Sequence, residues 1–220
     1  MTSHKLPLVQ LGLVGLVALS LPLSAWGAVY PPNTLLQLGP VLLTVLVAVP
    51  LLSRFPLSNT SVACIAAFLL LHDLAARWTY SDVPYEQWGE AIAGLSIDQA
   101  FGFTRNQFDR LVHFCFGLLA IRPVSEIARR HFGLGPRAAL YVAPEFVLAF
   151  SALYEIFEWL LAVAMDPASA DAYNGQQGDM FDSQKDMAIA AAGALISTVI
   201  QAIGRKGESE HGSPSQARMP

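Results

Sequence analysis

Residues 6–26 have the sequence LPLVQLGLVGLVALSLPLSAW, and residues 35–52 have the sequence LLQLGPVLLTVLVAVPLL. Neither stretch carries a charge, and between Lys5 and Asp73 the only charged residue is Arg54. A helix needs about 20 mainly apolar residues to cross the hydrocarbon core of a bilayer. A water-facing surface cannot be built from a segment with so few charges. These two stretches therefore predict membrane-spanning helices, and they decide the fold class.

The composition of the whole chain agrees with this prediction. Of its 220 residues, 54% are hydrophobic and only 14% are charged, whereas about 25% of the residues in a soluble domain are charged. This excludes a disordered protein and argues against a freely soluble enzyme. The net charge of −4 leaves no basic stripe, so we expect no nucleic-acid binding. Cys64 and Cys115 lie in apolar runs without zinc spacing and are interpreted as buried apolar residues.

We expect an all-α, polytopic transmembrane bundle that forms a single domain over residues 1–203, followed by a disordered tail at 204–220. The predicted spans lie near residues 6–26, 35–52, 60–77, 108–121, 138–164 and 187–203. The last span contains Gly193, which would allow close helix contact. The first span could instead be a cleaved signal peptide, because Lys5 precedes it and small residues follow it.

The distribution of basic residues predicts the orientation of the bundle. With the N-terminus inside, nine of the 13 Lys and Arg residues fall on the inner side of the six spans and four on the outer side. The short segment between Arg122 and Arg137 contributes most clearly to this excess. The positive-inside rule therefore predicts that both termini are cytoplasmic. Two longer segments, at residues 81–107 and 166–184, would then lie at the outer surface.

Polar residues from several predicted spans gather at this outer end. Those that we single out are His72, Tyr80, Asn106, Asp109, Arg110, His113, Glu155, Glu158, Gln177, Asp179, Asp182 and Asp186. Ionisable groups at membrane depth cost several kcal/mol unless they are paired or hydrated, so such a group is by default a functional site. We therefore expect an outward-facing polar cavity.

Helical spacing and residue type suggest two kinds of chemistry for this cavity. Asp109 and His113 are four residues apart and share a helix face, which suits general acid–base catalysis with Glu155 and Glu158. Asp179, Asp182 and Asp186 provide the oxygen ligands that Mg, Mn or Ca prefers, and His113 would be a nitrogen ligand beside them.

Simpler roles remain open for the same residues. Asp179 and Asp182 could cap the last helix and have no other role. His72 could be a hydrogen-bonded structural histidine, and Asp73 could form a local ion pair with Arg77.

Four motifs resemble those of the YjdF-like family of predicted bacterial inner-membrane proteins. Residues 105–114, RNQFDRLVHF, resemble its R-N-x-x-D-R-x-x-H-F signature, and residues 154–159, YEIFEW, resemble Y-E-x-x-E-W. Residues 177–187, QGDMFDSQKDM, are similar to Q-G-D-x-x-D-x-x-K-D-M, and residues 78–84, WTYSDVP, resemble Y-T-Y-x-x-V-P. Arg77 stands where the family pattern has a second histidine. The family is a domain of unknown function, so the resemblance implies a multi-pass protein of the inner membrane but no activity.

A weaker likeness connects the chain to VanZ-like membrane proteins. Its matching positions would be Asp109, His113, Glu155 and Asp182. This likeness implies, by analogy, a role at the outer face of the membrane in the cell envelope.

Three functions fit these patterns. The first is an envelope enzyme that uses metal-assisted or acid–base chemistry on a lipid-linked or small polar envelope molecule. The second is a structural or partner-binding membrane protein, in which the polar groups only tie helices together. The third is an ion-coupled transporter, for which Glu145 is the only acidic candidate in the inner half of the spans. In each case the lipid bilayer is a partner.

Overall fold

The computed structural model describes residues 5–211, and no strand occurs in that range. Six helices are long and apolar enough to cross a membrane. They are α1 (Leu8–Ala25), α2 (Pro31–Arg54), α3 (Asn59–Arg77), α6 (Phe108–Arg130), α7 (Pro136–Ala164) and α9 (Asp182–His211). The prediction of an all-α bundle with six spans is therefore confirmed.

The helix ends differ from the predicted ends mainly in α6 and α9. Helix α6 continues beyond the span predicted near residues 108–121, through Pro123 to Arg130. Helix α9 begins at Asp182 and continues to His211, so the first part of the predicted tail is helical. The rest of that tail, residues 212–220, lies outside the described residues. The two segments predicted at the outer surface contain the short helices α4 (Tyr85–Ala93), α5 (Ile97–Phe101) and α8 (Pro167–Asn174).

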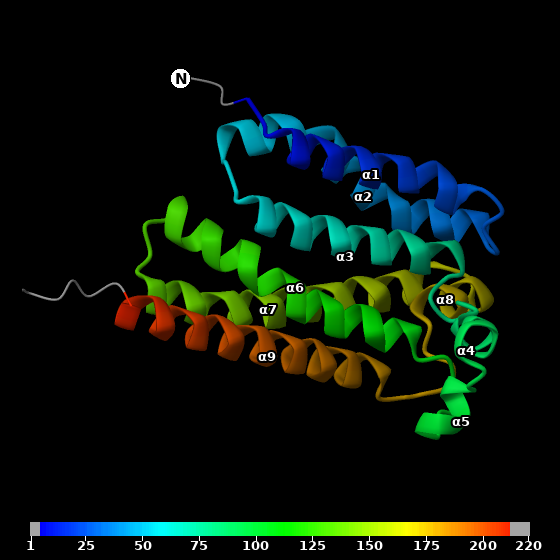
Figure 1. The fold of residues 1–220 in the computed structure, drawn as a ribbon. Helices are drawn as coiled ribbons and strands as arrows, with labels where there is room; N and C mark the ends of the chain where they lie inside the picture. Colours follow the sequence, from blue (N-terminus) through cyan, green and yellow to red (C-terminus); the bar gives the residue numbers. More distant parts are fainter. Residues whose placement is uncertain (1–4, 212–220) are drawn as a thin grey trace, which may run out of the picture.

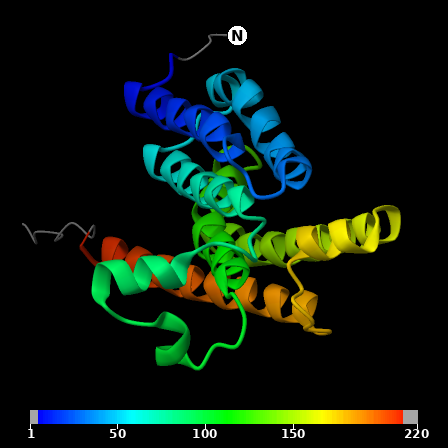
Figure 2. The same ribbon diagram turned by 90° about the vertical axis from the view of Figure 1, so that its right-hand side faces the viewer.

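The spans form two groups of three helices (Figures 1 and 2). Helices α1, α2 and α3 contact one another, as do α6, α7 and α9, and the contact between α3 and α6 joins the groups. At one end of this contact, Glu126 of α6 accepts hydrogen bonds from the backbone N–H and hydroxyl of Ser58, at 2.8 and 2.6 Å, and from the Ser61 hydroxyl. Because Ser58 caps α3, Glu126 fixes the start of that helix against α6.

The closest approach within the second group joins α6 to α9. A Cβ atom on Gly117 would overlap the backbone of Ala190, and one on Gly193 would overlap the backbone of Phe114. Small residues at membrane-helix interfaces allow the backbones to come this close. The contact fixes the relative position of α6 and α9, and both helices carry site residues.

The polar residues that the sequence singled out lie at one end of the bundle. We call the end that carries α4, α5 and α8 the loop end (Figure 1). The opposite end, where α2 ends at Arg54 and α6 ends at Arg130, is called the basic end. Which end faces the cytoplasm remains a prediction from the charge distribution.

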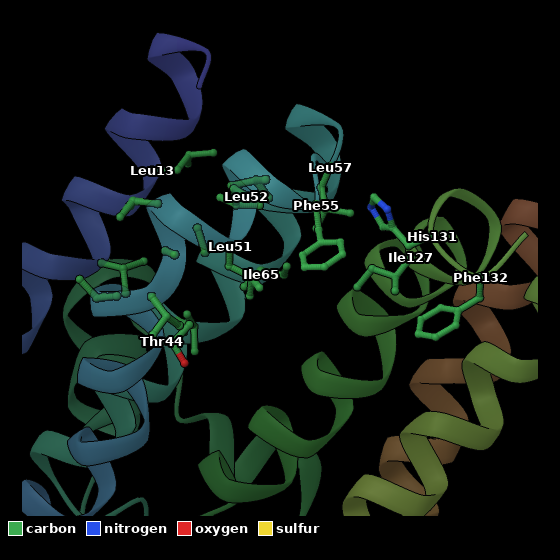
Figure 3. A pocket seen from close by; sticks show the side chains of 18 residues that line it. Leu13, Thr44, Leu51, Leu52, Phe55, Leu57, Ile65, Ile127, His131 and Phe132 are labelled. Carbon is green, nitrogen blue, oxygen red and sulfur yellow. The ribbon is translucent and has the colours of Figure 1, made fainter. Parts of the chain in front are cut away.

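An apolar groove of about 600 Å³ opens between the two groups near the basic end (Figure 3). Its lining extends from Thr44 to Phe55 on α2 and includes Leu13 of α1, Leu69 of α3 and His131 after α6. We refer to it below as the apolar groove.

Candidate functional site at the loop end

The first two turns of α6 place an acid and a histidine together. Asp109 and His113 are one helical turn apart, and both are buried. Their closest atoms, Asp109 Oδ1 and His113 Nε2, are 3.5 Å apart. The spacing of four residues predicted this shared face.

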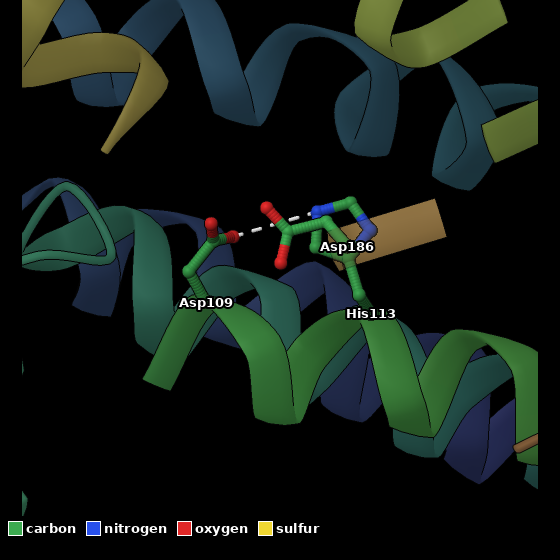
Figure 4. A group of neighbouring side chains, drawn as sticks. All are labelled: Asp109, His113 and Asp186. Atoms are coloured by element: carbon green, nitrogen blue, oxygen red, sulfur yellow. Dashed lines mark ion pairs between the residues drawn. The ribbon is translucent and has the colours of Figure 1, made fainter. Parts of the chain in front are cut away.

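Asp186 of α9 completes a cluster with these two residues (Figure 4). One ligand atom from each of Asp109, His113 and Asp186 lies within 4.8 Å of the others. All three side chains are buried, and Asp186 Oδ1 has no hydrogen-bond partner among the described residues. The nearest cation to this oxygen is Arg110, whose Nε lies 3.9 Å away. We call these three residues the acid–histidine cluster.

Helix α7 contributes Glu155 and Glu158 to a small pocket of about 110 Å³. The pocket is lined by Glu155, Glu158, Trp159, Ala162, Asn174, Gln176, Asp182 and Ser183. Glu155 Oε1 is buried without a hydrogen-bond partner in the described part of the chain. Trp159 also lines the pocket and is 63% exposed on the outer face of α7. We call this the acidic pocket. Its wall includes both the buried carboxylates and Trp159, which is on the face of α7 that would contact lipid.

All three aspartates that the sequence suggested as metal ligands have basic side chains close to them. Asp182 Oδ1 lies 2.6 Å from Arg105 Nη1 and 3.5 Å from Arg110 Nη2. Asp179 Oδ2 lies 2.8 Å from Arg110 Nη2 and 2.5 Å from Lys185 Nζ. Asp186 has the longest of these contacts, at 3.9 Å from Arg110 Nε, and of the three aspartates it alone lies in the acid–histidine cluster.

Asp179 shows the electrostatic effect of these partners. Hydrogen bonds from Lys185 and from the Phe181 backbone, together with the charge of Lys185 and a hydrogen bond from Arg110, lower the pKa of Asp179 to about 2. The carboxylate is therefore stabilised in its ionised form.

Asn106 and Gln177 are joined by two hydrogen bonds at the loop end. The Gln177 side chain accepts a hydrogen bond from the Asn106 N–H at 3.0 Å and donates one to the Asn106 carbonyl at 3.1 Å. Asn106 also accepts from the Phe108 N–H at 3.0 Å and donates to the Val83 carbonyl at 2.9 Å. These bonds fix the start of α6, and with it Asp109, so both residues position the site.

His72 and Tyr80 form a separate pair beside the site. The Tyr80 hydroxyl contacts His72 Nδ1, and His72 Nε2 lies 3.0 Å from the Gln37 carbonyl. Because a carbonyl only accepts, Nε2 carries the hydrogen and Nδ1 accepts from Tyr80. Burial, followed by the charges of Asp109, Tyr173 and Glu158, raises the pKa of Tyr80 well above its usual range, which keeps this donor protonated.

The sequence did not identify two residues of α8 as part of the site. Asn174 lines the acidic pocket and donates to the Glu158 carbonyl at 3.3 Å. Burial and the charge of Glu158 raise the pKa of Tyr173, while a hydrogen bond with Tyr154 lowers it. Their position just before the Gln177–Gly178–Asp179 motif was the only signal in the sequence.

The fold and the site define a multi-pass membrane protein with a buried acid–histidine cluster at one membrane end. The chain belongs to the DUF2238 family of predicted membrane proteins, whose family model matches residues 9–207. It is 31% identical over 169 residues to "Inner membrane protein YjdF" of Escherichia coli (strain K12), which covers 76% of this chain and 77% of that protein. No solved structure matches the chain. The YjdF-like resemblance and the inner-membrane location are thus confirmed, whereas the likeness to VanZ-like proteins stays a prediction.

Proposed function

We propose that the chain is a divalent-cation-dependent membrane enzyme that acts at the loop end on a lipid-linked or small polar molecule of the cell envelope. The observation that carries the proposal is the acid–histidine cluster, with three buried ligand atoms within 4.8 Å of one another. In the predicted orientation the site faces outward.

The chemistry of the three side chains supports a bound cation. Two neighbouring buried carboxylates repel each other, and an uncompensated buried charge is strongly unfavourable. Arg110 lies at the edge of the cluster but hydrogen-bonds to Asp179, so it compensates Asp186 only in part. Two carboxylates and one imidazole form a mixed oxygen and nitrogen ligand set, which Mn²⁺ fits better than Mg²⁺ or Ca²⁺.

The acidic pocket supports a role in catalysis for Glu155 and Glu158. A bound cation would polarise a substrate oxygen or lower the pKa of a bound water. Glu155 and Glu158 line a pocket that also contains Asp182 and is large enough for a polar group. We assign to the two glutamates the transfer of protons to or from the group bound there.

The position of Trp159 favours an amphiphilic substrate. Its ring is exposed on the membrane-facing side of α7 while it also lines the acidic pocket. Tryptophan is enriched where a membrane meets water. A lipid-linked molecule could therefore place its polar group in the pocket and keep its chains in the bilayer.

The proposal is tested by Mn²⁺ binding to the purified, detergent-solubilised protein after chelation. We expect one Mn²⁺ per chain, and affinity lowered at least about tenfold in Asp186→Asn and Asp109→Asn because each removes a ligand charge. Asp82→Asn is the matched control, since Asp82 is an exposed acid of the same end. Negligible Mn²⁺ binding by the parent protein, or equal binding in all four proteins, would contradict the proposal.

Thermal melting of the same variants addresses the purely structural role. If the cluster only ties α6 to α9, Asp186→Asn should melt at a lower temperature than the parent, whether or not Mn²⁺ is present. In our proposal, Mn²⁺ raises the melting temperature of the parent more than that of Asp186→Asn. Glu158→Gln should bind Mn²⁺ like the parent, because Glu158 is outside the cluster.

A further inference from the structure

The apolar groove lies far from the loop end and has no part in the proposed function. It is the larger of the two pockets described here, at about 600 Å³, and aliphatic and aromatic side chains dominate its lining (Figure 3). Thr44 and His131 are the only polar side chains in that lining. An occupant of this space must therefore be apolar.

The length of the apolar groove matches one leaflet of a bilayer. On α2 the lining extends from Thr44 to Phe55, at the end of the helix. At 1.5 Å per residue this corresponds to about 16 Å. Half of the hydrocarbon core of a bilayer is about 15 Å thick. A groove of this length that begins at the membrane surface would reach the level of the bilayer centre.

Two arginines lie where the apolar groove reaches the basic end. The Arg54 guanidinium lies over the Phe55 ring, with 5.2 Å between its central carbon and the ring centroid. Arg130 donates to the Pro56 carbonyl at 3.4 Å, so both arginines are held at the turn between α2 and α3. Arg54 has no acidic partner within 4.0 Å in the described part of the chain, whereas Arg130 also pairs with Glu126 at 3.1 Å.

His131, the residue that follows α6, packs at the same end. Its ring packs edge-on against Phe55, with centroids 5.5 Å apart, and its Nε2 lies 3.3 Å from the Pro56 carbonyl. The basic groups at the ends of α2 and α6 therefore lie around the turn between α2 and α3, next to the apolar groove. Arginine binds phosphate with several donors at once.

We propose that the apolar groove binds one acyl chain of an anionic phospholipid, whose phosphate headgroup contacts Arg54 and Arg130. The apolar lining and the length of the groove select an acyl chain. The two arginines select the charge of the headgroup, because basic residues at a membrane surface attract anionic lipids. Zwitterionic lipid would fill the apolar groove equally well but would lack the net negative charge.

The test uses tryptophan quenching in the full-length protein reconstituted in phosphatidylcholine vesicles. Phe132 lines the apolar groove and is exposed, so Phe132→Trp places a reporter there. The native tryptophans, Trp26, Trp78, Trp88 and Trp159, are in other segments, and the parent protein supplies their signal for subtraction. Brominated phosphatidylglycerol and brominated phosphatidylcholine are then compared as quenchers at equal mole fractions.

We expect phosphatidylglycerol to be preferred at the reporter by about fivefold for each arginine that contacts it. In the Phe132→Trp background, Arg54→Gln and Arg130→Gln should each lower this preference. Arg137→Gln is the matched control, since Arg137 is an exposed arginine at the same end but belongs to α7, which contributes no residue to the lining of the apolar groove. Its preference should equal that of the reporter protein alone.

Three outcomes would overturn the proposal. Equal quenching by the two lipids would show that the headgroup is not selected. If Arg137→Gln lowers the preference for phosphatidylglycerol as much as Arg54→Gln does, the lipid is attracted to the whole basic end and not to this site. Absence of quenching by either lipid would show that something other than lipid, such as a second copy of the chain, covers the apolar groove.

Discussion

Arg105 and Asp182 join the segment before α6 to the first turn of α9, with 2.6 Å between Arg105 Nη1 and Asp182 Oδ1. Arg105 also donates to the Gln176 carbonyl at 2.9 Å and the Gly175 carbonyl at 3.3 Å. A single guanidinium therefore holds α9 and the segment between α8 and α9 against the start of α6. Asp182 is only 3% exposed, and Arg105 is its nearest cationic partner.

Arg105→Gln should lower the free energy of unfolding by about 3 kcal/mol, because it leaves a buried carboxylate without its nearest cation. Chemical unfolding in detergent micelles measures this change. The double variant Arg105→Gln/Asp182→Asn should recover part of the loss, since the unpaired charge is then absent. Arg137→Gln, at an exposed position, should change stability by less than about 0.5 kcal/mol. Equal stability of Arg105→Gln and Arg137→Gln would contradict this account of the ion pair.

The glycine contact between α6 and α9 leads to a second prediction. Gly117→Ala should lower the free energy of unfolding by about 1–3 kcal/mol, because the new Cβ overlaps the Ala190 backbone and the helices must separate. Gly193→Ala should behave in the same way. Gly12→Ala on α1 is the control, since a Cβ there has open space around it, and it should leave stability unchanged or slightly raised. Unfolding in detergent measures all three, and a Gly117→Ala protein as stable as Gly12→Ala would show that the helices do not pack this closely.

Local patterns were sufficient to predict the six spans and the pairing of Asp109 with His113. Apolar length marks a span, and a spacing of four residues marks a shared helix face, so neither needs information from elsewhere in the chain. The predicted span stopped near residue 121 because the charged Arg122 follows it, whereas the helix itself continues to Arg130. In the structure Pro123 is buried within the helix, and Glu126 one turn later binds the start of α3.

The partners of the three aspartates could not be predicted in the same way. Asp182 and Asp186 are four residues apart on α9, so the spacing gives no reason to treat them differently. What distinguishes the aspartates is their contact with basic residues near the start of α6. Arg105 contacts Asp182, and Arg110 contacts Asp179. That arrangement follows from the relative position of the two helices, which the contact at Gly117 and Gly193 fixes.

The pH dependence of stability should contain a contribution from Asp179. Its pKa falls from 3.8 to about 2 in the folded protein. The ionised form is thus favoured by folding, and this stabilisation is present above the unfolded pKa and lost as the pH falls from about 4 toward 2. Asp179→Asn should therefore lose less stability than the parent across this interval. Thermal melting between pH 6 and pH 2 measures the difference.

Lys185→Met is the companion variant for this prediction. Lys185 lies 2.5 Å from Asp179 and is the largest cause of the lowered pKa. Its removal should reduce the contribution of Asp179 without abolishing it, because Arg110 and the Phe181 N–H remain. Identical pH profiles for the parent and Asp179→Asn would show that the pKa of Asp179 is not lowered by folding.

The pairing of His72 with Tyr80 leads to the last prediction. Tyr80→Phe keeps the ring but removes the donor to His72 Nδ1, so a polar ring nitrogen in the packed bundle loses its partner. The expected loss is about 1–3 kcal/mol in the free energy of unfolding. Tyr141→Phe is the control, because Tyr141 is 69% exposed on α7, and it should unfold like the parent. Combining Tyr80→Phe with His72→Leu should cost less than the sum of the two single changes, since each removes one side of the same hydrogen bond. Strictly additive losses in this double-mutant cycle, measured by unfolding in detergent, would show that the two side chains are not coupled.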